Sequence, residues 1–423
     1  MNYMGNNSIA ILPSNSEQQR SRDTDYRFRQ HSDFHYLSGF PEPDAVVVLL
    51  PGREQGEYIL FCREFDEKKA LWEGAHAGLE GAVAVFEADD SFPVDDLHEI
   101  LPGLLENKGK VYYPMGRDSD LDQHLMEWVN HIRNDSRSGV SAPAEFISLE
   151  HVLHDMRLFK SPAEIKLLRK AADVSAKAHI RAMKTCSSGM FEYQVEAEII
   201  HEFFSHGLRS AAYPSIVAGG SNACVLHYTE NSSKLCKGDL LLIDAGAECD
   251  HYAADITRTF PVSGQFTKPQ KQLYQLVLDA QITAIGQVRP GAPWNQAHEA
   301  AIEVLTEGLV SLGILKGEVA QLIENESYKP FFMHRIGHWL GMDVHDVGDY
   351  KLNDQWRLLE PGMVLTIEPG LYISGNEKNV DMKWRGIGIR IEDDVLVTHD
   401  GCEVLSSGVP KSIEEIETLM QAA

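Results

Sequence analysis

Two aspartates stand in apolar, strand-like segments, and their placement limits what this chain can fold into. The apolar segment 240–245 contains Asp244, and the predicted strand 251–260 contains Asp255. Aspartate is disfavoured in strands, and a buried carboxylate needs a compensating partner. A hairpin between the two segments would return both carboxylates to one side of a sheet, where a metal ion would compensate them. The alternative is a strand-end cap and a surface charge.

Two glutamates lie in similar surroundings. Glu368 ends the predicted strand 363–369, before a Pro-Gly turn, and Glu392 lies inside the predicted strand 386–397. The strand period of two places Arg390 and Glu392 on one face. An ion pair on a solvated edge is the alternative interpretation, but the glycines and isoleucines around them indicate a buried strand, where an uncompensated charge is costly.

Three histidines, His334, His338 and His345, lie within twelve residues of one another. His334 and His338 are four residues apart, as in a zinc-binding helix. However, Arg335 occupies the position that glutamate holds in the HExxH motif, and Gly337 disfavours a helix. A lone histidine is more often a core residue than a ligand, but three beside glycines favour a site. We therefore expect one imidazole of this group to join the four acids.

The charges of this set indicate two metal ions. Four carboxylates carry four negative charges, which two divalent cations would balance and one would not. Oxygen-rich ligation with a single imidazole suits Mn²⁺, with Co²⁺, Fe²⁺ or Zn²⁺ as alternatives. Two such ions about 3.5–4 Å apart would hold a bridging hydroxide for hydrolysis.

The composition excludes other classes of partner. The chain of 423 residues has 38 Lys and Arg against 63 Asp and Glu, a formal net charge of −25. We expect no nucleic acid and no membrane partner, because phosphates and anionic lipids attract basic surfaces. The longest apolar run, 45–50, is far shorter than the ~20 residues of a membrane span. Six scattered cysteines without a CxxC pair favour a reducing compartment, so we expect a cytoplasmic protein.

Two domains are expected, residues 1–155 and residues 156–423. The first alternates apolar strands with helices and is predicted to be an α/β domain. Its predicted strands cover residues 8–12, 45–50, 57–62 and 110–113, and one predicted helix covers residues 121–133. A Ser-Pro-Ala-Glu sequence at 161–164 has the pattern of a helix start. The segments that follow alternate predicted helices with predicted hairpins of short strands, which indicates an α+β domain.

The predicted elements of the second domain alternate along the chain. Helices are expected over residues 161–184, 191–206, 268–288 and 295–312, and strands over residues 215–218, 240–245, 251–260, 363–369 and 386–397.

The motifs around these residues resemble those of a known family. IDAGAECDHYAADITRTFP, HRIGHWLGMDVHDVG, EPGMVLTIEPGLYI and RGIGIRIEDD are similar to the Xaa-Pro aminopeptidases (aminopeptidase P) of the pita-bread metallopeptidase family, and the resemblance extends to YRFRQHSDFHYLSGF near the N-terminus. It implies an N-terminal α/β domain for oligomerisation and substrate access, followed by a pita-bread catalytic domain.

The same resemblance implies site residues. The implied ligands of a dinuclear, usually manganese, centre are Asp244, Asp255, His338, Glu368 and Glu392. The histidines that support these ligands or contact substrate are His227, His334 and His345, and Arg390 and Tyr372 line or order the site. Trp72 matches a tryptophan that reaches a neighbouring subunit's active site, which implies a homodimer or homotetramer.

The implied activity is hydrolysis of the N-terminal Xaa-Pro bond of peptides whose second residue is proline. We expect the metal-bridging hydroxide to attack, Glu368 to accept a proton, and His345 or His227 to stabilise the oxyanion. His227, His334 and Val344 are expected to shape the proline pocket.

Prolidase, which cleaves Xaa-Pro dipeptides, is the alternative activity. The segment 349–359 is short for a prolidase, although Arg335, Arg357 and Arg390 are candidate partners for a dipeptide carboxylate. A non-catalytic pita-bread module and a metal-free creatinase are disfavoured, because all five implied ligands are present.

Overall fold

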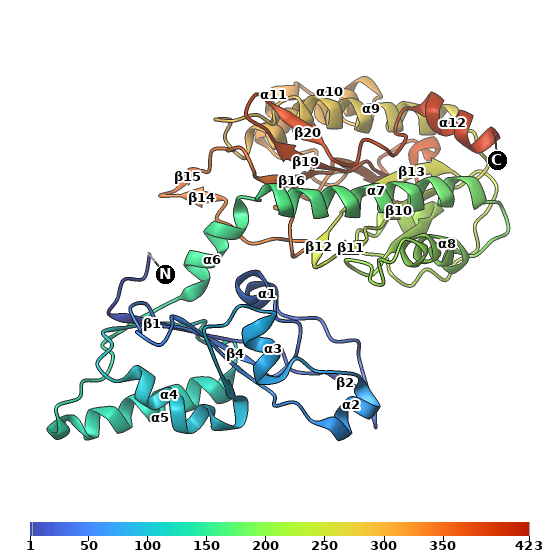
Figure 1. The fold of residues 1–423 in the computed structure, drawn as a ribbon. Coiled ribbons are helices and arrows are strands. Elements are labelled where there is room, and N and C mark those ends of the chain that lie inside the picture. Colours follow the sequence, from blue (N-terminus) through green and yellow to red (C-terminus); the bar gives the residue numbers. More distant parts are fainter. Residues whose placement is uncertain (2, 423) are drawn as a thin grey trace. The chain divides into compact units, whose positions relative to one another are not determined.

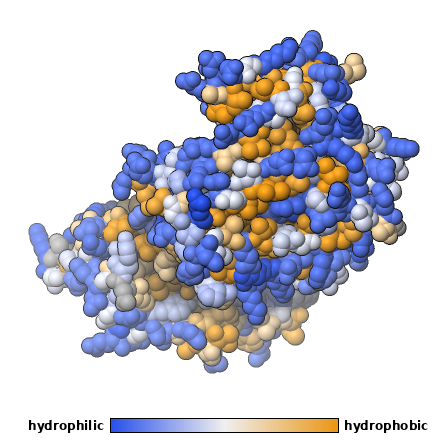
Figure 2. Space-filling view, turned by 90° about the horizontal axis from the view of Figure 1, so that it is seen from above, coloured by the Kyte–Doolittle hydropathy of each residue, from blue (hydrophilic) through white to orange (hydrophobic). Residues whose placement is uncertain are grey.

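The computed structural model describes residue 1 and residues 3–422, which form two compact units, Met1–Met156 and Arg157–Ala423 (Figure 1). Hydrophilic residues cover much of the face drawn in Figure 2, with smaller hydrophobic areas between them. Within the described residues, no helix combines the length and apolar character that crossing a membrane requires.

The first unit is built on a mixed six-stranded sheet with the order β6-β5-β4-β1-β7-β8. Its central strand β1 (Ser8–Pro13) pairs antiparallel with β4 (Val46–Leu49) and parallel with β7 (Lys110–Tyr112). The remaining strands are β5 (Tyr58–Cys62), β6 (Asp90–Pro93) and β8 (Glu145–Ile147), and β2 (Gln19–Ser21) and β3 (Thr24–Asp25) form a separate hairpin.

Both faces of this sheet are buried. Successive side chains of β1 point to opposite sides of the sheet, and all of them are buried. Ile9 and Ile11 belong to a core that also contains leucines of α4 (Leu97–Leu105) and α5 (Ser119–Asn134). Ala10 and Leu12 belong to the opposite core, with side chains of α1, α3 and α6. These helices span Ser32–Ser38, Gly78–Ala84 and Leu149–Leu158. By contrast, α2 (Glu67–Glu73) buries none of its residues.

The second unit contains two three-stranded antiparallel sheets and three two-stranded hairpins. One sheet has the order β13-β10-β9, and the other has the order β16-β19-β20. Their strands are β9 (Ile216–Gly219), β10 (Leu240–Asp244), β13 (Thr257–Pro261), β16 (Val364–Ile367), β19 (Asp393–Val397) and β20 (Cys402–Val404). The hairpins pair β17 (Gly370–Ile373) with β18 (Ile387–Arg390), β11 (Glu248–Cys249) with β12 (Tyr252–Ala253), and β14 (Lys351–Leu352) with β15 (Gln355–Trp356).

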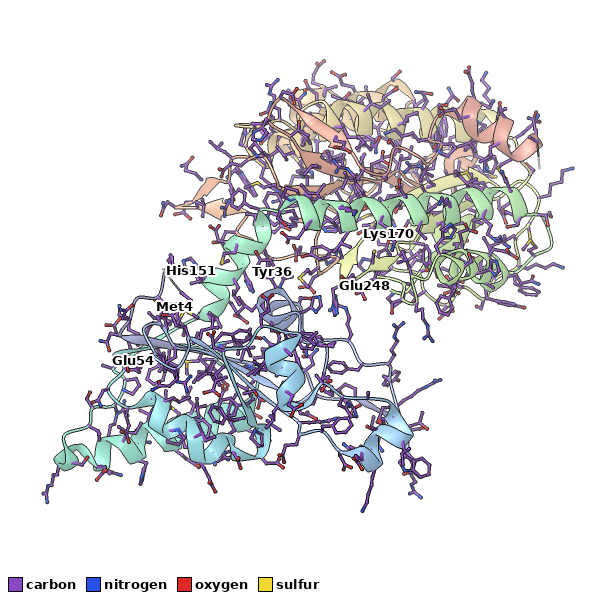
Figure 3. The ribbon with its side chains drawn as sticks, in the orientation of Figure 1. Met4, Tyr36, Glu54, His151, Lys170 and Glu248 are labelled. Atoms are coloured by element: carbon purple, nitrogen blue, oxygen red, sulfur yellow. The ribbon has the colours of Figure 1, made fainter. Side chains whose placement is uncertain are left out.

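One helix of this unit begins as its capping sequence predicts. In α7 (Pro162–Thr185), Ser161 Oγ accepts from the main-chain N–H of Glu164, and the Glu164 carboxylate accepts from that of Ser161. This helix packs on β11 and β12, and Figure 3 labels Lys170 on α7 and Glu248 on β11. The other helices are α8 (Glu192–Ser205), α9 (Lys268–Ile285), α10 (Gln296–Ser311), α11 (Val319–Glu324) and α12 (Ile413–Gln421).

Two strand predictions are wrong in the same way. The predicted strand 251–260 is two strands, β12 and β13, and Asp255 lies in the gap between them. The predicted strand 386–397 is likewise divided into β18 and β19, with Glu392 in the break. Each break lets the two flanking strands pair with different partners. For example, β18 pairs with β17, whereas β19 pairs with β16. The acids therefore sit where regular pairing stops.

Candidate metal centre

The ends and breaks of these strands meet around a cavity of about 280 Å³. Asp244 is the last residue of β10, Glu368 directly follows β16, and Asp255 and Glu392 occupy the two strand breaks. The residues that line the cavity are Leu226, His227, Asp244, Asp255, His334, Arg335, Gly337, His338, His345, Glu368, Arg390 and Glu392. The structure thus brings together all five residues that the family resemblance of the motifs implied as metal ligands.

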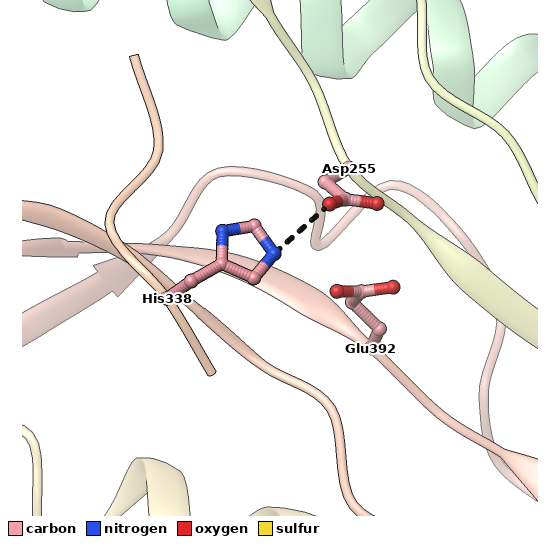
Figure 4. Close-up of side chains that lie close together, drawn as sticks. All are labelled: Asp255, His338 and Glu392. Carbon is pink, nitrogen blue, oxygen red and sulfur yellow. Dashed lines mark ion pairs between the residues drawn. The ribbon is translucent and has the colours of Figure 1, made fainter. Parts of the chain in front are cut away.

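Asp255, His338 and Glu392 form the tightest group (Figure 4). One potential ligand atom of each lies within 4.8 Å of the others. His338 Nε2 lies 3.3 Å from Asp255 Oδ2 and 3.8 Å from Glu368 Oε1. His338 Nδ1 lies 2.9 Å from the carbonyl oxygen of Trp339. In the neutral ring this contact takes the proton on Nδ1, which leaves the Nε2 lone pair directed at the acids and free for a metal.

The loop that carries His338 needs glycine to approach the sheet. A Cβ atom on Gly337 would lie 2.1 Å from the carbonyl oxygen of Thr366 in β16. The main-chain N–H of His338 donates to Thr366 Oγ1 at 3.1 Å, and that of Thr366 donates to the His338 carbonyl at 3.0 Å. The sequence therefore correctly excludes a zinc-binding helix here, since this segment runs beside a strand.

Asp244 and Asp255 share one phenol. Tyr213 Oη lies 2.6 Å from Asp244 Oδ1 and 2.6 Å from Asp255 Oδ1. A hydroxyl has a single proton, so it donates to one carboxylate at a time. Tyr213 therefore bridges the two aspartates through one hydroxyl and itself compensates neither of their negative charges.

Arg390 supports the opposite side of Asp244. Its Nη2 donates to Asp244 Oδ2 at 2.7 Å, its Nη1 to Tyr372 Oη at 3.0 Å and its Nε to Thr257 Oγ1 at 3.0 Å. The Tyr372 hydroxyl also lies 2.8 Å from His334 Nε2. Because these groups are buried, the chain of contacts fixes Asp244 and orients His334 together.

Glu392 is held by both its side chain and its main chain. Thr257 Oγ1 donates to Glu392 Oε2 at 2.7 Å, and the main-chain N–H of Glu392 donates to the Thr257 carbonyl at 3.0 Å. Arg258 Nη1 donates to the carbonyl oxygen of Glu392 at 2.6 Å. Next along the chain, Asp393 forms a buried ion pair with Arg258 at 2.7 Å, and both Asp394 carboxylate oxygens accept from the Asp255 main-chain N–H at 3.2 Å.

The electrostatics of the cavity favour a bound cation. Burial raises the pKa of Glu368 to about 7 and that of Glu392 well above its usual value, with the neighbouring acids adding to the Glu392 shift. Burial alone would lower the pKa of His338, but its hydrogen bond to Asp255 raises it to about 9. Without a cation, burial and mutual repulsion therefore disfavour the ionisation of all these acids together. Three buried acids, the partly buried Glu368 and one imidazole with a directed lone pair fit divalent metal ions.

The other predicted site residues are distributed as follows. His227 and His345 are exposed and line the cavity, and the His345 ring packs edge-on against His338 with ring centres 4.2 Å apart. Tyr372 is 2% exposed and lies behind His334, and neither it nor Val344 is among the described residues that line the cavity. Trp72 lies on α2 of the first unit and is 88% exposed.

Sequence reasoning missed four residues that order the acids: Tyr213, Thr257, Arg258 and Asp393. Thr257, Arg258 and Asp393 directly neighbour predicted ligand segments, and a Thr-Arg pair in a buried strand was an available signal. Tyr213 is separated from the aspartates by 31 and 42 residues, so no local pattern connects it to them.

Comparison with known proteins places both units in described families. The aminopeptidase P N-terminal domain matches residues 1–112, and metallopeptidase family M24 matches residues 166–399. The Xaa-Pro aminopeptidase of Escherichia coli (strain K12) is 46% identical over 417 residues, which cover 98% of this chain and 94% of the relative.

Solved structures agree with the sequence matches. Pseudomonas aeruginosa aminopeptidase PepP superimposes with a TM-score of 0.98 at 56% identity, covering 99% of this chain and 95% of that one. Zinc-substituted E. coli aminopeptidase P in complex with product has a TM-score of 0.96 at 45% identity, with coverages of 99% and 95%. The predicted fold, an N-terminal α/β domain followed by a pita-bread catalytic domain, is confirmed. The chain therefore belongs to metallopeptidase family M24 and carries the N-terminal domain of aminopeptidase P.

Proposed function

We propose that the protein is a metal-dependent aminopeptidase that removes the N-terminal residue from peptides with proline in the second position. The observation that carries this proposal is the convergence of Asp244, Asp255, His338, Glu368 and Glu392 on one cavity. The extensive similarity to Xaa-Pro aminopeptidases supports the substrate class.

The five residues would hold two divalent ions. We propose Mn²⁺, because oxygen donors with one imidazole suit it, with Co²⁺, Fe²⁺ and Zn²⁺ as alternatives. Bound ions would activate the attacking water and polarise the scissile carbonyl.

The chain's own residues supply the remaining chemistry. Glu368, whose pKa burial raises to about 7, is suited to accept a proton and pass it to the leaving proline nitrogen. His345 and His227 line the cavity, and the proposal assigns them the role of donating to a developing oxyanion. Arg390, occupied by Asp244 and Tyr372, positions these groups instead of binding substrate directly.

The Xaa-Pro bond imposes its own requirement. It is a tertiary amide without an N–H, so the site must accept a ring where other peptides present a donor. His227 and His334 line the cavity and are proposed to shape this pocket. Val344, which directly precedes His345 in the chain, is proposed to contribute to it.

One assay tests the activity and its closest alternative. Metal-free protein is titrated with Mn²⁺, Co²⁺ and Zn²⁺, and kcat/KM is measured for matched Xaa-Pro dipeptides, Xaa-Pro-Xaa tripeptides and Xaa-Ala-Xaa tripeptides. We expect metal-dependent cleavage of Xaa-Pro-Xaa tripeptides and weaker cleavage of Xaa-Pro dipeptides. Tripeptides in which alanine replaces the proline should be cleaved little. A clear preference for dipeptides would assign the protein to prolidase.

We further propose that residues 1–155 serve oligomerisation and substrate access in a cytoplasmic homodimer or homotetramer. Trp72 and Leu71 on α2 are 88% and 87% exposed, which is unusual for large apolar side chains that have no partner. If Trp72 reaches a neighbouring subunit's site, Trp72→Ala raises KM mainly for longer peptides, and dilution to monomers has the same effect. Full activity in a monomeric species would contradict this assembly.

A further inference from the structure

The proposed chemistry gives no role to one cationic side chain at the cavity, that of Arg335. Arg335 lines the same cavity as the acids and follows His334 directly in the chain. Arg335 is exposed, whereas Arg390, at the centre of the site, is buried with 4% of its surface exposed. Arg335 and Arg390 both line this cavity, in a chain with a formal net charge of −25.

A hairpin holds this guanidinium in place. Arg335 Cζ lies 5.0 Å from the centre of the Trp356 ring, and Lys351 Nζ lies 4.5 Å from the same ring. Lys351 and Trp356 are directly paired across β14 and β15. The turn between them, Asn353 and Asp354, has φ angles of 48° and 62°, which suits the tight hairpin turns that asparagine and aspartate favour. A cation is attracted to the face of an indole, so Trp356 restricts where Arg335 points.

The indole contact leaves the N–H donors of Arg335 available. Over residue 1 and residues 3–422, the side chain of Arg335 has no hydrogen bond and no ion pair, and the same holds for Lys351. Arg390 differs, because its guanidinium already donates to Asp244, Tyr372 and Thr257. Arg357 is 6% exposed and lies over the ring of Phe159, which places it in the interior. Of the three arginines considered for carboxylate binding, Arg335 is the accessible one.

The charge pattern of the cavity indicates what Arg335 would bind. The acids at the cavity attract the cationic amino end of a peptide and repel any carboxylate that the peptide carries. A carboxylate on the leaving side of the scissile bond therefore needs a cation of its own, apart from the acids. The planar guanidinium matches a carboxylate with two parallel hydrogen bonds, and Lys351, whose ammonium lies over the ring of Trp356 as well, adds positive charge to this region.

We propose that Arg335, held by Trp356, is a specificity-determining subsite for a substrate carboxylate on the C-terminal side of the Xaa-Pro bond. This inference rests on the proposed aminopeptidase function. The carboxylate has three sources in peptides: the terminus of a tripeptide, an acidic side chain on the third residue of a longer peptide, or the proline carboxylate of a dipeptide.

Matched substrates distinguish the three sources. The first pair is Ala-Pro-Ala as free acid and as C-terminal amide. The second is Ala-Pro-Glu-Ala amide and Ala-Pro-Gln-Ala amide, and the third is Ala-Pro as free acid and as amide. Each pair differs in a single negative charge, so the ratio of kcat/KM within a pair measures the contribution of that charge.

In the Mn²⁺-loaded full chain, we expect at least one pair to favour the acid by roughly tenfold, which is the size of a charge-assisted hydrogen bond at a partly exposed site. Arg335→Gln should bring this ratio close to one, with the change in KM instead of kcat. Arg335→Lys should retain part of the preference. Trp356→Leu should reduce it less, because that change loosens the cation without removing it. Increasing the salt concentration should also reduce the wild-type ratio.

Arg169→Gln is the matched control. Arg169 is an exposed arginine whose partner is Glu403, outside the cavity, and its loss should leave the ratio unchanged. Equal hydrolysis of acids and amides by the wild-type protein, or a preference that survives in Arg335→Gln, overturns the subsite while leaving the aminopeptidase activity in place. If the wild-type protein cleaves neither the neutral amides nor the acids, the proposed function is contradicted, and the subsite proposal with it.

Discussion

Arg258 donates a hydrogen bond of 2.6 Å to the main-chain carbonyl oxygen of Glu392, from a guanidinium that is fully buried. This contact fixes the main chain of a proposed metal ligand without using its carboxylate. The charge of Arg258 is balanced by Asp393, which also accepts from Lys411 Nζ at 2.7 Å and from Gln281 Nε2 at 2.7 Å. The position of Glu392 therefore depends on an ion network behind the cavity.

Asp393→Asn should destabilise the protein strongly. The substitution leaves the buried Arg258 charge without its counterion, and breaking a buried pair in this way typically costs about 3–5 kcal/mol. The Arg258 and Lys411 cations hold the pKa of Asp393 at about 2 against the effect of burial, so the carboxylate is ionised at neutral pH. The measurement is the free energy of unfolding in urea, with metal removed from both proteins.

An exposed ion pair provides the control. Arg169 and Glu403 form a pair at 2.7 Å with side chains 46% and 42% exposed. Glu403→Gln should change the unfolding free energy by about 0–1 kcal/mol, as exposed pairs do. Similar losses in both variants would show that the Asp393 network is no more important than a surface contact.

The longest helices of this fold and several of its buried strands could be predicted from the sequence, because their determinants are local, whereas the shorter helices were not predicted. The capping box at Ser161 predicts the start of α7, and the apolar run through Leu240 predicts β10. The breaks at Asp255 and Glu392 could not be predicted, since they depend on which partner each half-strand finds. The hydrophobic pattern of a sequence indicates which residues are buried, but it does not indicate which strands pair with each other.

The site shows the same division between local and distant information. The acids stand out because carboxylates in apolar strands require compensation. The residues that order them do not, because a buried tyrosine or threonine is unremarkable in sequence. Tyr213 becomes informative only when folding brings its hydroxyl between Asp244 and Asp255.

Tyr213→Phe should weaken metal binding while leaving the fold intact. The phenol lies 2.6 Å from one oxygen of each aspartate, and its removal lets the two carboxylates move relative to each other. Loss of a hydrogen-bonding partner behind a metal ligand typically lowers affinity by about 10–100-fold. The measurement is the Mn²⁺ dissociation constant by isothermal titration calorimetry.

Tyr252→Phe is the corresponding control, because the Tyr252 hydroxyl donates to Glu164 on α7 at 2.9 Å and not to a proposed ligand. Its Mn²⁺ affinity should match that of the wild-type protein. Equal affinities in the Tyr213 and Tyr252 variants would contradict the role of the shared phenol.

His179 predicts how stability changes with pH. This histidine is fully buried on α7, and its Nε2 lies 3.0 Å from the carbonyl oxygen of Ala245. Burial lowers its pKa to about 4. Between pH 4 and 6.5 the unfolded chain binds a proton that the folded chain does not, so the stability attributable to this group falls as pH decreases through that window.

His179→Gln removes this titration and keeps a side-chain N–H for Ala245. Relative to the variant, the wild-type protein should lose about 2–3 kcal/mol of unfolding free energy between pH 7 and pH 4.5, at about 1.4 kcal/mol per pH unit. The difference is measured by urea unfolding of both metal-free proteins, so that titration of the cavity acids cancels. A constant difference across this range would show that His179 titrates normally in the folded chain.

Glu368→Gln tests the acid proposed to handle the proton. Glu368 directly follows β16, and its main-chain N–H donates to the carbonyl oxygen of Ile336 at 2.7 Å, so the substitution leaves the main-chain contact in place. The amide cannot accept a proton, and loss of acid–base assistance alone typically lowers kcat by about 10²–10⁴. We expect at least this loss with an Xaa-Pro tripeptide at saturating Mn²⁺. Metal content measured on the same samples separates a loss of metal from a loss of chemistry, and Glu303→Gln, on α10 and outside the cavity lining, controls for the change of charge. A metal-loaded Glu368→Gln variant with near-normal kcat would remove Glu368 from the mechanism and direct attention to the histidines of the cavity.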